Sequence, residues 1–416
     1  MSVSAHRRQG EADSLQALYQ FPCSGAIRRR GEPKPTDKTM KLLTYLPRPA
    51  NPGRSMFKLL GVLAAVLLST CAPLLAGGWT VHSATGTGPS QRSAPAVSAL
   101  GKDVFLFGGV FDSLTAPEHV PYNDLYRFDT KSNRWTLLQP QGAAPAPRAF
   151  AASAAHEGSR RIFVFGGGVN TDPFYSDFSV YDDLWAYDTR ANTWSQIQPV
   201  NAGPSGRSRP AVWMVGNRLY VFGGINGFFS TLNDLWVFNV QSRQWTELIP
   251  DGAVGSPPPR HEAAYGTGAQ GGRLILYGGE TLGQFGFETL ADTWEYNIGR
   301  NRWENVTPAP EFNVDPPRNL VAAGVLKGDL YIHGGDLPGG DPCCGSPFPQ
   351  NVTNEFWRFD GKSGIWEEIS GCVGAAPALK RHRAVEVGKD LFLFSGFDFT
   401  DPEGQAWNLS VYSFRP

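Results

Sequence analysis

A Gly-Gly doublet at the end of a short apolar run recurs along this chain at nearly constant spacing. Five full copies and a degenerate sixth stand at Gly108–Gly109, Gly166–Gly167, Gly223–Gly224, Gly278–Gly279, Gly334–Gly335 and Ser395–Gly396. The steps between them are 58, 57, 55, 56 and 61 residues. A period in this range is typical of supersecondary units that pack against their neighbours, so the doublets predict six such units.

Each doublet stands within a longer pattern that also repeats. An arginine after a Pro- or Gly-rich stretch precedes it, at Arg92, Arg148, Arg207, Arg260, Arg318 and Arg381. An acidic residue two positions before an aromatic one follows it, at Asp124, Asp183, Asp234, Asp292 and Glu355, with a weak sixth copy in 408–414. A lone tryptophan comes next, at Trp135, Trp194, Trp245, Trp303 and Trp366. This pattern resembles the kelch repeat, and the resemblance covers 77–416.

The kelch resemblance implies an all-β fold, a six-bladed β-propeller with four antiparallel strands per blade. The third unit agrees, because four aromatic or β-branched segments bounded by turn residues occur at Ala211–Val215, Arg218–Phe222, Asp234–Asn239 and Trp245–Ile249. No segment of 77–416 keeps a 3.6-residue apolar period, so almost no helix is expected. One such sheet cannot bury both faces, whereas six around an axis can. The doublets are interpreted as structural, since glycine tolerates positive φ and close backbone approach.

Trp79 completes the set of fourth-strand tryptophans from the far end of the chain. The last unit has no tryptophan after its third strand, whereas Trp79 lies 13 residues before Arg92, the gap that also separates Trp135 from Arg148. We therefore expect an N-terminal strand around Trp79 to complete the sixth blade and close the ring.

Three regions differ in composition. Residues 1–55 hold ten Lys or Arg against four Asp or Glu and little apolar periodicity, which predicts a disordered extension. In residues 56–76 an apolar stretch and small residues follow the basic residues Arg54 and Lys58, the pattern of a secretory signal peptide, with Met56 as an alternative start. A signal anchor and a lipid anchor at Cys71 stay open as alternatives. Residues 77–416 would form the mature propeller.

The composition of 77–416 bounds the compartment and the partners. It holds 26 basic and 34 acidic residues, and this acidic balance argues against nucleic acid as a partner. Three cysteines offer one disulfide and fit an exported protein: Cys343, Cys344 and Cys372. Glycosylation sequons occur at Asn305, Asn351 and Asn408. We expect a monomer that is secreted or otherwise lies outside the cytoplasm, in contact with a membrane only through an N-terminal anchor.

The segments after the doublets vary most between repeats. The distance from the first glycine of a doublet to the acidic residue of the repeat pattern is 16, 17, 11, 14 or 21 residues, and variable loops on a constant scaffold indicate a recognition surface. These loops carry side chains suited to stacking on peptides or sugars, with packing inside the loop as the alternative. The candidates are His119, Phe174, Phe229, Phe287 and Phe399.

Basic residues near the inner strands form a second set of candidate contacts. Repeat arginines could bind anionic groups bidentately or bridge blades; they are Arg148, Arg207, Arg260 and Arg318. Neighbouring residues that the repeat does not dictate are stronger candidates for ligand contact. These are Arg209, His261, His382 and Arg383.

Enzymes built on kelch-type propellers give the alternatives to a binding module. A copper-radical oxidase resembling galactose oxidase needs two His and two Tyr ligands and a nearby Cys, a set not visible here. A specifier-type iron site resembling Glu-x-x-x-Asp-x-x-x-His is missing too, because the nearest spacing ends at Tyr296. A sugar mutarotase needs only an acid–base pair, which His261 or His382 with Glu118 or Asp398 could supply.

The sequence therefore predicts an exported module that binds a protein or glycan through the loops of one face, without a cofactor or a metal. A carbohydrate-active enzyme is the alternative.

Overall fold

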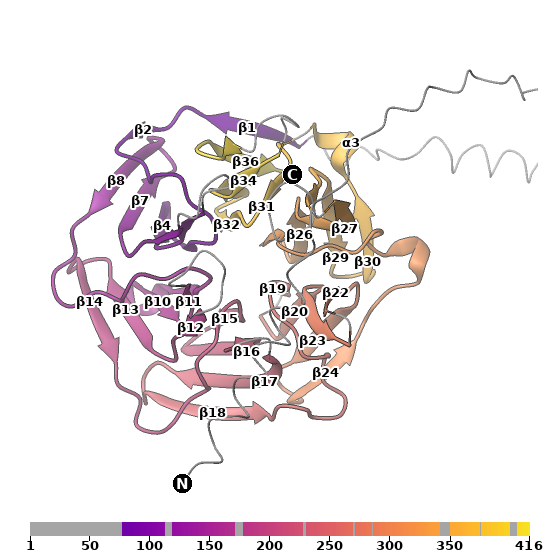
Figure 1. Ribbon diagram of the computed structural model, residues 1–416, viewed down its shortest axis with the longest axis horizontal. Coiled ribbons are helices and arrows are strands. Elements are labelled where there is room, and N and C mark those ends of the chain that lie inside the picture. The colour runs from indigo at the N-terminus through magenta and orange to yellow at the C-terminus, as the bar shows by residue number, and fades with distance from the viewer. Residues whose placement is uncertain are drawn as a thin grey trace, which may run out of the picture. The chain divides into compact units, whose positions relative to one another are not determined.

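Six antiparallel sheets are arranged around a central axis in the computed structural model of this chain (Figure 1). The structure describes residues 77–112, 119–170, 178–227, 230–268, 271–284, 286–341, 350–374, 376–399 and 406–416. Each sheet has four main strands, and the first strands of neighbouring sheets contact one another around the axis. The expected six-bladed propeller is confirmed.

Every blade follows the same order from the axis outward. In chain order, the blades consist of β3 (Ala96–Leu100), β4 (Asp103–Phe107), β7 (Leu125–Asp129) and β8 (Arg134–Leu138); β9 (Ala152–His156), β10 (Arg161–Phe165), β13 (Leu184–Asp188) and β14 (Thr193–Ile197); β15 (Ala211–Val215), β16 (Arg218–Asn226), β17 (Ser230–Asn239) and β18 (Gln244–Ile249); β19 (Ala264–Thr267), β20 (Arg273–Tyr277), β23 (Thr293–Asn297) and β24 (Arg302–Asn305); β25 (Ala322–Leu326), β26 (Asp329–His333), β29 (Phe356–Asp360) and β30 (Ile365–Glu368); and β32 (Arg383–Val387), β33 (Asp390–Phe394), β36 (Val411–Arg415) and β1 (Gly78–His82). The short β2 (Thr85–Gly86) pairs parallel with β8 at the outer edge of the first blade.

Helical structure is scarce, as the sequence predicts. Within the described ranges it amounts to 3-10 turns at Glu157–Ser159 and Pro310–Phe312 and the four-residue α3 (Ser370–Val373). None of these described helices has the length and the run of apolar residues needed to cross a membrane.

The hydrophobic core lies between neighbouring blades. Fourth-strand tryptophans insert against the second strand of the preceding blade: the rings of Trp194 and Phe107 have centroids 5.1 Å apart, and those of Trp303 and Phe222 are 5.0 Å apart. These edge-on contacts bury large aromatic surfaces at each joint. The repeated tryptophans therefore hold blade against blade.

The N-terminal strand closes the ring. β1 pairs antiparallel with β36, with Trp79 opposite Phe414. The Trp79 ring packs 4.9 Å from Phe356 of the fifth blade and 5.3 Å from His333. Trp79 thus packs between the fifth and sixth blades as the other fourth-strand tryptophans pack between their own blades. The predicted closure is confirmed.

The doublets end the second strands where other backbones pass close by. Gly108 and Gly109 have φ values of 64° and 94°. A Cβ on Gly108 would lie 2.6 Å from the carbonyl oxygen of Arg148, and one on Gly109 would lie 2.8 Å from that of Ser93. Both the conformation and the space favour glycine.

The segments after the doublets form β-ribbons instead of irregular loops. In chain order, their strands are β5 (Val110–Asp112) with β6 (His119–Pro121), β11 (Gly168–Asn170) with β12 (Phe178–Val180), the extended ends of β16 and β17, β21 (Glu280–Gly283) with β22 (Gly286–Thr289), β27 (Asp336–Asp341) with β28 (Gln350–Val352), and β31 (Leu379–Lys380) with β34 (Phe397–Asp398) and β35 (Ala406–Trp407). All of them extend from the end of the blades at which the first strands begin. We call this end the ribbon face.

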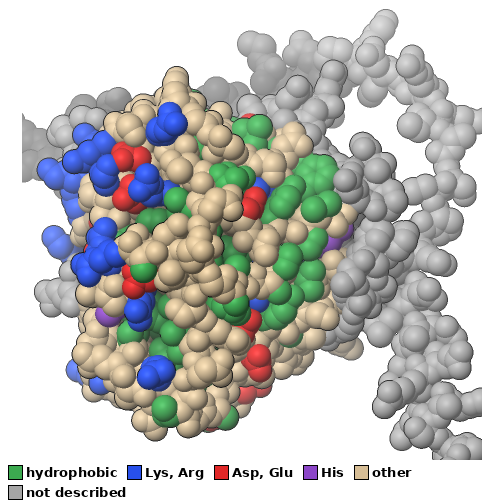
Figure 2. All heavy atoms as spheres, turned by 90° about the vertical axis from the view of Figure 1, so that its left-hand side faces the viewer, with side chains coloured by type: hydrophobic (Ala, Val, Ile, Leu, Met, Phe, Trp, Pro, Cys, Tyr) green, Lys and Arg blue, Asp and Glu red, His purple; other side chains and the backbone are tan. Residues whose placement is uncertain are grey.

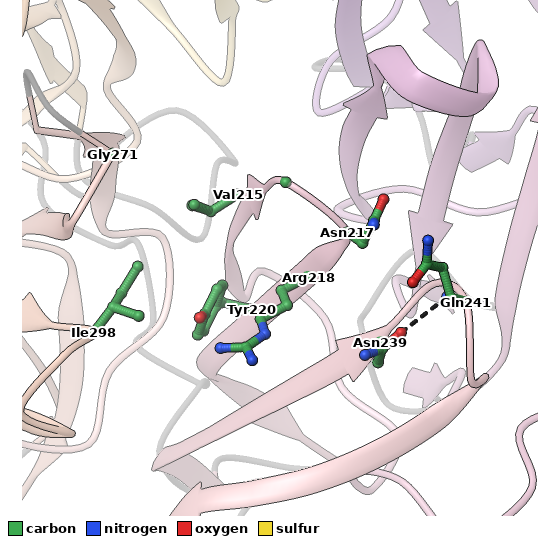
Figure 3. A pocket seen from close by; sticks show the side chains of 9 residues that line it. Val215, Asn217, Arg218, Tyr220, Asn239, Gln241, Gly271 and Ile298 are labelled. Carbon is green, nitrogen blue, oxygen red and sulfur yellow. Dashed lines mark hydrogen bonds between the residues drawn. The ribbon is translucent and has the colours of Figure 1, made fainter.

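The opposite end of the blades carries tight turns. Exposed basic residues such as Lys102, Lys131 and Arg190 lie there, and Lys102 pairs with Asp129. Figure 2 shows Lys and Arg side chains gathered with acidic ones toward one edge of the propeller wall. A shallow groove of about 460 Å³ between the third and fourth blades is lined at this end by turn residues such as Asn217 and Gln241 (Figure 3).

Several sequence predictions lie outside the described residues. They concern the extension 1–55, the signal-like segment 56–76, and Cys343 and Cys344. Cys372 is placed in α3. Export and the disulfide therefore stay predictions.

Candidate functional site

The repeat arginines are buried at the ribbon face and paired within their own blades. Arg207 Nη1 donates to the carbonyl of Gly223 (3.0 Å) and to Asp234 Oδ1 (2.6 Å). Its Nη2 donates to Asp234 Oδ2 at 2.9 Å, which completes a bidentate pair. Trp236 Nε1 donates to the same carboxylate at 2.8 Å. The residues of three repeat signatures thus meet in one network.

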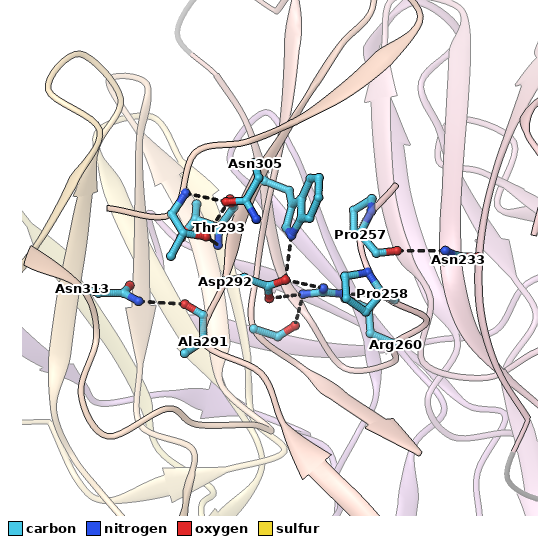
Figure 4. A network of polar contacts seen from close by, with 12 residues as sticks. Asn233, Pro257, Pro258, Arg260, Ala291, Asp292, Thr293, Asn305 and Asn313 are labelled. Atoms are coloured by element: carbon cyan, nitrogen blue, oxygen red, sulfur yellow. Dashed lines mark hydrogen bonds and ion pairs between the residues drawn. The ribbon is translucent and has the colours of Figure 1, made fainter. Parts of the chain in front are cut away.

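The arginine–carboxylate pair recurs in the first five blades, and the bond from the arginine to the first glycine carbonyl recurs in the first four. Figure 4 shows it for Arg260 and Asp292. The remaining pairs are Arg92–Asp124, Arg148–Asp183 and Arg318–Glu355. All five arginines are at most 1% exposed. This burial and these bonds favour a scaffold role for Arg148, Arg207, Arg260 and Arg318, and ligand contact by them stays an untested prediction.

The sixth blade departs from this pattern. Leu379 occupies the arginine position, since its carbonyl accepts from Gly335 N (2.8 Å) as that of Arg148 accepts from Gly109 N. The expectation that Arg381 is the sixth repeat arginine is therefore wrong by two residues. The strand register places Ser410 where the other blades carry the acidic residue. The arginine and its partner are lost together.

Asn408 takes over part of the missing network. Its Nδ2 donates to the carbonyl of Ser395 at 3.0 Å, the position equivalent to the first glycine of a doublet, and its Oδ1 accepts from Ser410 N at 3.0 Å. Asn408 is only 5% exposed. This burial does not favour glycosylation of Asn408 in the folded protein.

Two residues after each arginine position, the chain adopts a left-handed conformation in all six blades. These residues have φ between 52° and 59° and form what we call the axial ring: Ala94, Phe150, Arg209, Glu262, Leu320 and Arg381. Backbone N–H groups join most of them to the carbonyl of the preceding member, as in Phe150 N to Ala94 O (2.9 Å) and Ala94 N to Arg381 O (3.0 Å). The conformation repeats while the side chains differ, so the ring is a constant frame for variable chemistry.

Charged side chains of the axial ring are paired. Arg209 Nε lies 3.1 Å from Glu262 Oε1, and the Arg209 guanidinium stacks 4.1 Å from the centroid of the Phe150 ring. Arg381 Nη1 donates to Asp112 Oδ2 at 3.3 Å. The axial ring therefore places positive and negative side chains beside the aromatic side chain of Phe150.

His119 and Lys380 lie beside this ring. His119 Nδ1 is 2.5 Å from Asp112 Oδ1, and Lys380 Nζ donates to Asp336 Oδ2 at 2.8 Å. Burial lowers the pKa of Lys380, and the Asp336 carboxylate opposes that shift.

His261 is buried next to two carboxyl groups. It is 1% exposed, and its Nε2 lies 3.9 Å from Glu280 Oε2. Burial first, and then the charge of Arg209, keep the pKa of His261 well below its usual value, so the His261 imidazole is neutral. Burial and the neighbouring Glu262 raise the pKa of Glu280 to about 7. Asn319 donates a hydrogen bond to Glu280.

His382 lies in the joint between the fifth and sixth blades. Its Nε2 is 2.9 Å from Nδ1 of His333, and both residues are fully buried. Burial lowers both pKa values, that of His333 to about 3. Arg383 Nε donates to the carbonyl of Pro95 at 3.2 Å. Because His261 and His382 are both buried, the structure does not favour them as the acid–base pair of a mutarotase.

The predicted aromatic candidates fall in different places. Phe287 is 38% exposed on β22, and its ring lies edge-on to His261 at 5.2 Å. The Phe399 ring lies 5.0 Å from Lys380 Nζ. Phe174 and Phe229 lie outside the described residues.

A groove of about 580 Å³ on the ribbon face separates the first and sixth blades. It is lined by Ser90, Gln91, Phe111, Val120, Tyr122 and Leu409. Leu409 is 58% exposed and Val120 is 38% exposed, while Phe111 stacks on Trp407 with centroids 5.4 Å apart. The sequence analysis did not identify Leu409 as a candidate. A signal for it was present, since the equivalent position is polar in four of the other five blades.

The fold and this face define a kelch-type β-propeller, and comparison with known proteins agrees. The family model described as the KLHDC2/KLHL20/DRC7 Kelch-repeats domain matches residues 69–224 and 110–335. The chain therefore belongs to the kelch-repeat family.

Individual relatives share parts of the chain. Kelch domain-containing protein 3 of Bos taurus and of Homo sapiens are each 31% identical over 204 residues, 48% of this chain and 51% of theirs. The chain thus matches about half the length of these curated relatives. It is also 25% identical over 320 residues to N-(sulfonatooxy)prop-2-enimidothioate sulfolyase of Thlaspi arvense, 72% of this chain and 86% of that protein.

Proposed function

We propose that this propeller is the binding module of an exported protein and recognises a protein or a glycan through its ribbon face. The groove between the first and sixth blades carries the proposal, because it offers exposed apolar side chains beside charged ones. Phe111 lines the groove, and the next residue, Asp112, pairs with Arg381 of the axial ring. An apolar surface with a few convergent polar groups is typical of a recognition site.

The groove suits one side chain of a protein ligand or one sugar ring. Leu409 and Val120 supply apolar contact, and the Tyr122 ring, 4.2 Å from the Arg92 guanidinium, supplies a fixed aromatic surface. Rigid aromatic groups bind at a small cost in conformational entropy. Membership of the kelch-repeat family fits a protein-interaction module.

The test screens the full chain on peptide and glycan arrays and then measures the Kd of the best ligand for two variants. Leu409→Asp should weaken binding more than about tenfold, because it places a charge in the apolar groove. Val254→Asp is the matched control, since Val254 is fully exposed in a peripheral turn. Equal affinity of both variants and the wild type would contradict the proposed site.

Export is tested separately. We expect expression in a secreting host to give a product that lacks 1–76, as N-terminal sequencing would show. Retention of this segment in the secreted or membrane-bound product would instead support an anchor.

A further inference from the structure

A buried cluster at the junction of the fourth and fifth blades leaves several polar atoms without hydrogen bonds. Neither ring nitrogen of His261 has a hydrogen-bond partner among the described residues, nor do Oε2 of Glu262 and Oδ1 of Asn319. Buried polar atoms in folded proteins are almost always satisfied by protein groups, ordered water or a bound ion, so a concentration of such atoms marks a place where a small polar ligand can bind. His261 is the strongest sign, because its ring is 1% exposed and lies beside two carboxyl groups.

The cluster has the dimensions of a cation site. His261, Glu262 and Glu280 each offer one ligand atom, and these atoms lie within 4.8 Å of one another. Two donors about 2.1 Å from a tetrahedral ion are roughly 3.4 Å apart, and His261 Nε2 is 3.9 Å from Glu280 Oε2. A small side-chain movement would bring both donors onto one ion.

The backbone holds these donors in place. His261 and Glu280 exchange both of their backbone hydrogen bonds at 2.9 Å, which makes them the two opposed residues of an isolated β-bridge. Glu262 stands in the axial ring with φ 54°. Asn319 reaches the cluster from the fifth blade and donates to Glu280. Three structural elements therefore converge on the cluster.

We propose that His261, Glu262 and Glu280 bind one divalent transition-metal ion, with Asn319 Oδ1 available as a further ligand. An imidazole with two carboxylates matches Zn²⁺, Mn²⁺ or Co²⁺ better than Ca²⁺ or Mg²⁺, which prefer oxygen ligands alone. The two carboxylates balance the charge of the ion. Arg209 contacts Oε1 of Glu262 and leaves Oε2 for the metal.

This site differs from the specifier-type motif considered above, whose nearest spacing in this chain is 288–296. The ion would join the axial ring to ribbon β21 and to the start of the fifth blade. It is therefore expected to stiffen the ribbon face next to Phe287.

The test titrates the metal-free full chain with Co²⁺ and follows the visible d–d absorption, with Mg²⁺ and Ca²⁺ as competitors. Three proteins are compared: the wild type, Glu280→Gln and Glu288→Gln. Glu280→Gln is nearly isosteric, and Glu288→Gln is the matched control because Glu288 is exposed on the same ribbon. His261→Ala, checked for folding by circular dichroism, is the second ligand variant.

We expect one Co²⁺ per wild-type chain, unchanged binding by Glu288→Gln, and binding weakened more than about tenfold by Glu280→Gln and by His261→Ala. Mg²⁺ and Ca²⁺ should not displace the ion. Absence of stoichiometric binding by the wild type would overturn the proposal, as would wild-type affinity in both ligand variants. A sulfur-to-cobalt charge-transfer band would place the ion on cysteine and would overturn it equally.

Discussion

The first five blades and the sixth blade share one fold but are held together differently. In all five, a buried arginine pairs with the acidic residue of its own blade, and in the first four it also donates to the first glycine carbonyl of the doublet. In the sixth, Leu379 and Ser410 replace that pair, and Asn408 alone reaches the equivalent carbonyl. The sixth blade also takes its outer strand from the other end of the described propeller.

The difference shows where the repeat is free to change. Where the ion pair is kept, the residue before the acidic one is polar in four of the five blades, and Asn123 and Asn233 donate from this position to backbone carbonyls of the scaffold. Where it is lost, Leu409 projects into the groove that the sixth blade shares with the first. Departure from the repeat therefore coincides with the surface that we propose for binding, which agrees with the general placement of function on variable segments of a rigid frame.

Removing the closing strand should have the largest effect. Deletion of 77–83 would expose an edge of the sixth blade and remove the aromatic contacts of Trp79 with Phe356 and Phe414. We expect the cooperative thermal transition to shift strongly downward or to disappear in calorimetry. Val81→Ser is the control, since Val81 is 64% exposed on the same strand. A Tm unchanged by the deletion would refute noncovalent closure of the ring.

Removing a buried ion pair from one of the first five blades should have the second-largest effect on stability. Arg207→Ala leaves Asp234 buried without its partner, and breaking a buried pair costs about 3–5 kcal/mol of unfolding free energy. Asn408→Ala in the sixth blade removes neutral hydrogen bonds and should cost about 1 kcal/mol. Urea unfolding of both variants gives the comparison. Equal losses would mean that the two kinds of blade are held equally.

The ion pair of Arg260 and Asp292 should also make the stability depend on pH in the acid range. Burial alone would raise the pKa of Asp292, but hydrogen bonding and the charge of Arg260 lower it below its usual value. Such a group stabilises the fold above its unfolded pKa, and this contribution is lost as the pH falls through the folded pKa. The stability gap between the wild type and Asp292→Asn should therefore narrow from pH 7 to pH 3. Ser410→Asn, which changes no ionisable group, should show a gap that does not depend on pH.

Much of the fold could be predicted from the sequence because its signals are periodic. The doublets fix six units, and the gap from Trp79 to Arg92 identifies the closing strand. The position of the sixth arginine was predicted wrongly because Arg381 lies two residues from Leu379, and a basic residue there imitates the pattern. The backbone hydrogen bonds and the left-handed conformation of Arg381 reveal the shift.

The candidate site was less predictable. The axial ring is defined by a left-handed conformation that residues as different as Ala94 and Glu262 adopt, so no residue type marks it. The burial of His261 depends on packing by a ribbon and a neighbouring blade, which local sequence does not encode. Pairing within the separate ribbons rests on strands of two to six residues, which are too short for a clear alternation.

The most direct test of the account measures both stability and ligand affinity for Arg207→Ala and Leu409→Asp. We expect opposite effects from the two variants. Arg207→Ala should lower the unfolding free energy while its folded fraction keeps the wild-type Kd, whereas Leu409→Asp should keep the wild-type stability while its Kd rises more than about tenfold. If Leu409→Asp instead unfolds the protein, or binds the array-selected ligand as the wild type does, the groove of the sixth blade is scaffold and the account is contradicted.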